Sequence, residues 1–145
     1  MKAYRYTWDG GCHCGNIHLS FSSDAQADEL QVRECQCGFC RRHGVRTATD
    51  RNGELKITVN EADNISQYSH GLSVAEFYVC RRCGTYVAAV MQVNDATFAT
   101  LNINTLTDNP FGQRRGAPAN YTTETAIERA DRRTRMWTPT TVSGT

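Results

Sequence analysis

Hydrophobic and polar residues alternate along most of the first hundred positions of the chain. Residues 16–22 place Ile17, Leu19 and Phe21 on one face with polar side chains between them, and residues 54–59 repeat this alternation. A side-chain period of two is typical of a strand with one buried face. Further segments of this kind follow at residues 65–69, 75–80, 85–91 and 97–103. Turn-rich segments separate them, so we predict a mainly β, mostly antiparallel fold with the cysteines in its loops.

The pattern changes after residue 107. Residues 108–120 contain two prolines and several other turn-forming residues, which predict a loop, and residues 123–137 have weak helical spacing. We therefore expect the chain to end in a short helix or an extended tail. Arginines outnumber acidic residues in this part of the chain, but ion pairs on an exposed surface explain such charges without a nucleic-acid partner.

Length and composition limit the class of protein. The 145 residues predict one domain over positions 1–145, and the 39% of hydrophobic residues predict a modest core that needs further stabilisation. No stretch approaches the ~20 apolar residues of a membrane span, and the start lacks the apolar segment of a secretory signal. We predict a cytoplasmic protein without a membrane partner. The net charge of +1 disfavours nucleic acid as a partner.

The seven cysteines suggest the source of that stabilisation. They form two pairs and a triplet, namely Cys12 with Cys14, Cys80 with Cys83, and Cys35 with Cys37 and Cys40. In a reducing compartment, CxC and CxxC spacings and an odd count favour metal ligands over disulfides. A structural zinc is closed by four ligands, whereas a catalytic zinc has three protein ligands and one exchangeable position. Seven cysteines therefore predict two Zn²⁺ ions per chain.

The two pairs are the predicted structural ligands. Each pair is followed directly by a glycine, which permits a tight turn that brings backbone N–H groups toward the sulfurs. Each pair also lies beside a predicted strand. Two pairs from distant parts of the chain would meet at one zinc and connect the sheets, which makes Cys12, Cys14, Cys80 and Cys83 the structural set.

The triplet of Cys35, Cys37 and Cys40 is the predicted catalytic zinc site. His43 leaves an alternative, because a fourth ligand would close the site as a structural Cys3His centre. Three thiolates give the zinc a formal charge of −1, so it is poorly suited to activate water and well suited to bind and deprotonate a thiol. The bound thiol would attack, or leave from, a soft carbon such as that of an aldehyde.

Arginine supplies nearly all of the 16 basic residues, and its planar guanidinium binds carboxylates bidentately. Arg41 and Arg42 directly follow Cys40, and we predict that they bind an acidic thiol such as glutathione. Solvated charges beside a metal site are the alternative interpretation of these arginines.

Three segments carry a family resemblance. GGCHCGNIHLSF, CQCGFCRRHG and FYVCRRCGTYV, in this order, resemble the glutathione-dependent formaldehyde-activating enzyme family, which also includes centromere protein V. The resemblance covers about residues 9–105 and leaves 106–145 as a C-terminal extension. It implies a β-tent of antiparallel sheets stapled by two zincs, with the cysteines in the two roles given above. It also implies a carbon–sulfur lyase activity, which joins formaldehyde to the thiol of glutathione to give S-hydroxymethylglutathione.

Two functions are consistent with these features. The first is a zinc-dependent carbon–sulfur lyase that acts on adducts of glutathione, or another small thiol, with an aldehyde. The alternative is a non-enzymatic, zinc-stabilised binding module that contacts nucleic acid or protein through its arginine-rich C-terminal part. The low net charge and the open triplet favour the lyase.

Overall fold

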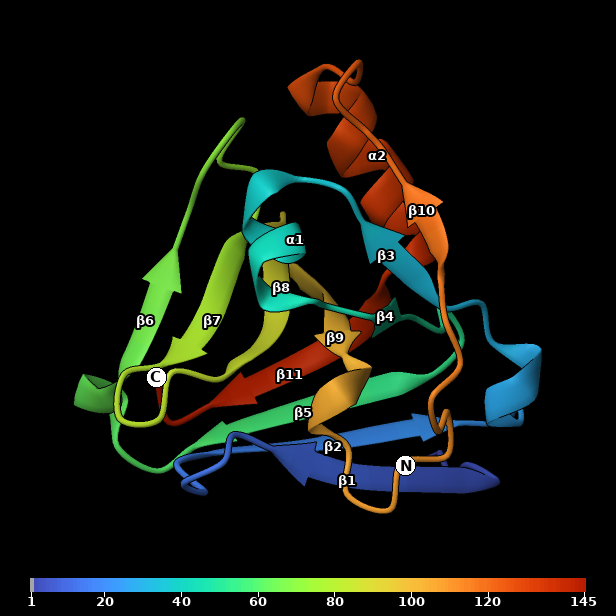
Figure 1. The fold of residues 1–145 in the computed structure, drawn as a ribbon, viewed down its shortest axis with the longest axis vertical. Coiled ribbons are helices and arrows are strands. Elements are labelled where there is room, and N and C mark those ends of the chain that lie inside the picture. Colours follow the sequence, from blue (N-terminus) through green and yellow to red (C-terminus); the bar gives the residue numbers. More distant parts are fainter. Residues whose placement is uncertain (1) are drawn as a thin grey trace.

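The structure is a computed structural model that describes residues 2–145, and it is mainly β, as predicted (Figure 1). Its eleven strands belong to one sheet in which most neighbours are antiparallel. The strands are β1 (Tyr6–Gly11), β2 (Ile17–Ser23), β3 (Arg33–Cys35), β4 (Thr47–Ala48), β5 (Glu54–Val59), β6 (Ile65–Tyr68), β7 (Glu76–Cys80), β8 (Tyr86–Val93), β9 (Ala96–Asn102), β10 (Ala117–Ala119) and β11 (Thr138–Ser143). The helices are α1 (Gly38–His43) and α2 (Ala126–Met136), with 3-10 turns η1 (Ala27–Glu29), η2 (Ala62–Asn64) and η3 (Ile103–Thr105). No helix within residues 2–145 is long and apolar enough to cross a membrane.

The predicted alternation is realised in β2 and β5. Ile17, Leu19 and Phe21 are fully buried, and the antiparallel register places Leu19 opposite Ile57 and Phe21 opposite Leu55. Each of these side chains stabilises the fold by about 1.5–3 kcal/mol through removal of apolar surface from water. The first core of the protein lies along this face.

Strand β8 separates two cores. Its residues from Tyr86 to Met91 are all buried, because the strand lies between β7 and β9 and is covered on both faces. Val87 packs into the first core, whereas Tyr86 and Ala89 pack into a second one. The second core also contains Cys40, so one member of the cysteine triplet is anchored there.

The end of the chain differs from the prediction. The expected short helix is present as α2, but the chain then continues into β11, which pairs in parallel with β5 and antiparallel with β9. The strand reads TPTTVS and has a single strongly apolar residue, so it carries no alternation signal. The C-terminal strand therefore connects the part of the sheet that contains β5 to the part that contains β9. The alternative of an extended tail is not what the structure shows.

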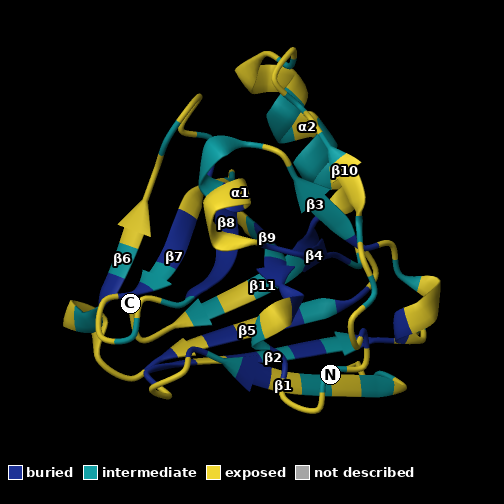
Figure 2. Cartoon of the chain, viewed as in Figure 1, coloured by how far each residue is buried: buried dark blue, intermediate teal, exposed yellow. Residues whose placement is uncertain are grey.

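The sheet has the outline of a tent. In Figure 1, β1, β2 and β5 form the lower layer, β6 and β7 rise on one side, and β3, β10 and α2 rise on the other. Helix α1 lies between the two sides. Figure 2 shows that the buried residues concentrate in the strands of the interior, while the loops and the far end of α2 are exposed.

Candidate metal centres and the adjoining cavity

Two hairpin turns bring the first set of cysteines together. Cys12 and Cys14 lie between β1 and β2, Cys80 ends β7, Cys83 lies before β8, and the four Sγ atoms are all within 4.8 Å of one another. The Sγ–Sγ distances are 3.7 Å for Cys12 and Cys14 and 3.5 Å for Cys14 and Cys80. A tetrahedral centre with metal–sulfur bonds of about 2.3 Å separates its sulfurs by about 3.8 Å. The four thiols therefore fit one four-coordinate metal.

The backbone around these thiols adopts the expected tight turns. Gly15 and Gly84 have φ angles of 87° and 80°, in the left-handed region that favours glycine. The N–H of Gly84 donates to the carbonyl of Cys80 at 2.8 Å, and the N–H of Ile17 donates to Sγ of Cys12 at 3.2 Å. The first bond closes the turn after Cys80, and the second can stabilise Cys12 as a thiolate and orient it for a metal.

The triplet is built where β3 meets α1. Cys35 ends β3, Cys37 is the N-cap of α1, Cys40 lies in its first turn, and their three Sγ atoms are within 4.8 Å of one another. Sγ of Cys37 accepts a hydrogen bond from the backbone N–H of Cys40 at 3.3 Å. Hydrogen bonds from Cys35, and then from Cys40, lower the pKa of Cys37. The contact with Cys37 raises the pKa of Cys35, and the contacts with Cys35 and Cys37 raise the pKa of Cys40.

Arg41, Arg42 and His43, which follow Cys40 in sequence, do not join the thiol cluster. Among the described residues, only the three thiols form this cluster, and His43 lies outside it, with its ring 4.5 Å from that of Phe39. Arg41 and Arg42 are exposed on α1, and Arg42 donates to the carbonyl of Gly38 at 2.9 Å. Neither arginine lines a cavity at the triplet. Their role in substrate binding stays a prediction.

Two cavities border the triplet. An inner one lies against Cys35 and Cys40, and its walls are mainly apolar, with Phe77, Tyr86 and Trp137 among them. An outer one, of about 320 Å³, lies against Cys35 and Cys37. That volume is at the lower end of the range for small-molecule sites. The outer cavity is lined further by His70, Gly71, Leu72, Phe77, Asn120, Tyr121, Thr122, Glu124, Arg129 and Arg133. A three-thiol cluster that opens onto such a cavity can bind a metal and present it to a small ligand.

Comparison with known proteins agrees with the motifs. The family model described as glutathione-dependent formaldehyde-activating enzyme matches residues 7–124. The chain belongs to this family. The resemblance predicted from the cysteine motifs is thereby confirmed. A crystal structure of a Rhodobacter sphaeroides protein is similar, with a TM-score of 0.59 and 30% identity over 77% of this chain and 99% of that one. No curated protein matches the sequence.

The sequence does not predict several of the residues that line the two cavities. His70 lies 30 positions beyond Cys40, yet its ring packs edge-on against Phe77 at 4.5 Å and lines the outer cavity. Tyr121 and Arg133 line both cavities. None of these residues has a spacing that relates it to the cysteines, so no sequence signal could have identified them.

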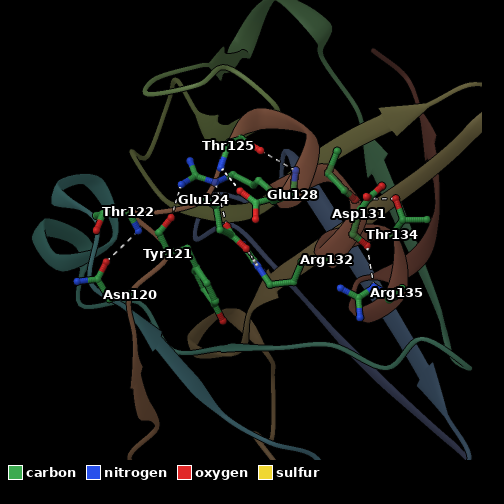
Figure 3. Close-up of polar contacts among 12 residues, drawn as sticks. Asn120, Tyr121, Thr122, Glu124, Thr125, Glu128, Asp131, Arg132, Thr134 and Arg135 are labelled. Carbon is green, nitrogen blue, oxygen red and sulfur yellow. Dashed lines mark hydrogen bonds and ion pairs between the residues drawn. The ribbon is translucent and has the colours of Figure 1, made fainter.

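A shared carboxylate holds α2 beside the cavities. Glu124 accepts from Nε of Arg132 at 2.7 Å and from Nε of Arg129 at 3.3 Å, and the Arg132 guanidinium lies 3.5 Å from the Tyr121 ring centroid (Figure 3). Thr125 caps the helix, since its side chain accepts from the N–H of Glu128 at 3.1 Å. These contacts fix the helix from its N-terminal end.

We expect Glu124→Gln to destabilise the protein by about 1–3 kcal/mol at neutral pH, because three charge-assisted hydrogen bonds from two arginines to a partly buried carboxylate are weakened. The hydrogen bond from Arg132 lowers the pKa of Glu124 below its ordinary value of 4.5. A lowered folded-state pKa adds stability above the ordinary pKa that is lost as the pH falls through the folded value. Urea unfolding should therefore show a difference in unfolding free energy between wild type and variant at pH 7 that narrows as the pH falls below the ordinary value of 4.5.

The matched control is Asp131→Asn on the exposed part of α2, which should leave the unfolding free energy nearly unchanged. An equal effect of the two substitutions, or a difference between wild type and Glu124→Gln that does not narrow as the pH falls, would contradict the assigned role of Glu124.

Proposed function

We propose that the protein is a zinc-dependent carbon–sulfur lyase that acts on adducts of glutathione, or another small thiol, with an aldehyde. The observation that carries the proposal is the three-thiol cluster that opens onto a cavity, in a member of the glutathione-dependent formaldehyde-activating enzyme family. The cytoplasm is the proposed location, since thiols stay reduced there.

The choice of zinc rests on the donor set. Thiolates are soft ligands that select zinc among the common divalent ions, and the sulfur spacing of the four-cysteine cluster suits its tetrahedral geometry. We assign Cys12, Cys14, Cys80 and Cys83 to a structural zinc and Cys35, Cys37 and Cys40 to a catalytic one. Zinc at the triplet would supply a fourth position for a substrate thiol in its thiolate form.

The residues around the triplet support addition of a thiol to a carbonyl group. In that reaction a bond forms between the thiolate sulfur and the carbonyl carbon, and the carbonyl oxygen takes up one proton; the reverse reaction releases thiol and aldehyde. The inner cavity is mostly apolar and limits the access of water to the reacting carbon. Burial raises the pKa of Tyr86 well above its ordinary value, so its phenol stays protonated and can donate to the carbonyl oxygen.

The contacts of the arginine-rich C-terminal part favour the lyase over the binding module. Arg114 donates to the carbonyls of Ala27 and Leu30, and Arg115 pairs with Glu34 at 2.7 Å. Arg129 and Arg132 pair with Glu124. These four arginines, of the six between residues 114 and 135, thus make contacts within the protein. Few cationic side chains of this segment are left to bind the phosphates of a nucleic acid.

The test is a panel of thiols and aldehydes on zinc-loaded protein, beginning with glutathione and formaldehyde. Adduct formation and breakdown, followed by NMR exchange, should exceed the uncatalysed rate. Absence of acceleration with every thiol, together with tight and salt-sensitive binding of nucleic acid, would assign the protein to the binding-module class instead.

A further inference from the structure

Helix α2 adds charge to the cavity from outside the family-matched segment. That segment ends at residue 124, while α2 begins at Ala126. The helix nevertheless contributes Arg129 and Arg133 to the outer cavity, which Cys35 and Cys37 border on another side. A ligand preference that these two arginines confer is therefore a property of this chain and does not follow from the family match.

Arg133 differs from its neighbours on α2. Arg129 and Arg132 share the carboxylate of Glu124, at 3.3 and 2.7 Å. Nε of Arg133 is buried and has no hydrogen-bond partner in the described chain, and no ion pair within residues 2–145 involves this side chain. A buried guanidinium donor without an acceptor costs free energy, of the order of 1–3 kcal/mol or more for a charged group. A ligand that supplies the acceptor would recover it.

The guanidinium is also held in place. Its central carbon lies 4.5 Å from the centroid of the Trp137 ring, and Trp137 is a buried member of the second core. A cation stacked on an aromatic face keeps its edge available for in-plane hydrogen bonds. Arg133 lines both cavities, so its side chain borders the space next to the triplet.

We propose that Arg133 determines substrate specificity by binding a carboxylate of the thiol whose sulfur reaches the cysteine triplet. The inference rests on the proposed function. A carboxylate is favoured over a phosphate because the cavity offers one guanidinium without an ion pair, which matches a single negative charge. The substrate is therefore a small thiol acid, or an adduct of one with an aldehyde.

The experiment compares two thiols of nearly equal shape, 3-mercaptopropionate and its uncharged amide 3-mercaptopropionamide. Each is titrated into zinc-loaded protein, and binding is followed by calorimetry and by tryptophan fluorescence. Wild type should bind the acid at least about tenfold more tightly than the amide, the difference expected for one charge-assisted hydrogen bond. Arg133→Gln should remove this preference without a change in zinc content, and Arg133→Lys should keep part of it.

The matched control is Arg135→Gln, an exposed arginine of the same helix, which should keep the full preference. Intrinsic differences between the two thiols cancel, because the ratio of the affinities for acid and amide is compared between variants. Equal affinity of wild type for acid and amide would overturn the role of Arg133 and leave the thiol proposal standing. Binding of neither thiol would overturn both. Displacement of the acid by an equal concentration of inorganic phosphate would also overturn the assignment to a carboxylate.

Discussion

Cys80→Ser is expected to leave the protein largely unfolded at room temperature. Binding of structural zinc is itself folding free energy, on the order of 10 kcal/mol in small zinc domains, while a whole domain is stable by only about 5–15 kcal/mol. Cys80 and Cys83 join the β7–β8 hairpin to the thiols of the β1–β2 hairpin. Loss of one of these ligands would release two distant parts of the sheet from each other.

Circular dichroism and thermal unfolding of zinc-loaded protein measure this effect. Cys37→Ser provides the matched comparison, because it is the same substitution in the other cluster. A cooperative transition in Cys80→Ser with the midpoint of wild type would show that the four-cysteine cluster does not stabilise the fold.

Cys37→Ser is expected to abolish the reaction and leave the fold intact. Serine is a preferred N-cap residue, so α1 keeps the cap that Sγ of Cys37 now provides to the N–H of Cys40. The triplet rests on strands and a core that exist without it, and we expect a loss of stability below about 1 kcal/mol. The variant should bind one zinc instead of two, and adduct formation should fall to the uncatalysed rate.

Metal analysis and the exchange assay on one preparation check both expectations. Retention of two zinc ions together with undiminished exchange would remove the triplet from the proposed chemistry.

The parts of the fold that the sequence predicts are those with a local, repeating signal. Alternation marks β2 and β5 because one face of each strand is buried, as Leu19 and Ile57 show. The cysteine spacing similarly groups the thiols, since ligands of one metal lie close together in short turns. Strand β11 has no such signal. It is held by pairing with β5 and β9, and backbone pairing places few demands on side chains.

The walls of the cavity could not be predicted for a related reason. Arg133 and His70 line the cavity beside the triplet only because the chain folds back there. Each lies in a segment whose local sequence pattern is that of an ordinary surface. Proximity to Cys40 in sequence favoured Arg41 and Arg42, yet the helical turn after the cysteine directs these side chains to solvent. Neighbours in sequence are poor guides to a site that is built from α2 and α1 together.

Cobalt substitution tests most directly whether the triplet is open to a substrate thiol. Cobalt replaces zinc at both sites, and glutathione is titrated into wild type and into Cys37→Ser. We expect stronger sulfur-to-metal charge-transfer absorption and release of about one proton per chain in wild type, because only a thiolate binds, and neither change in the variant. A wild-type spectrum that glutathione leaves unchanged, or an equal response in Cys37→Ser, would show that the triplet does not bind a substrate thiol.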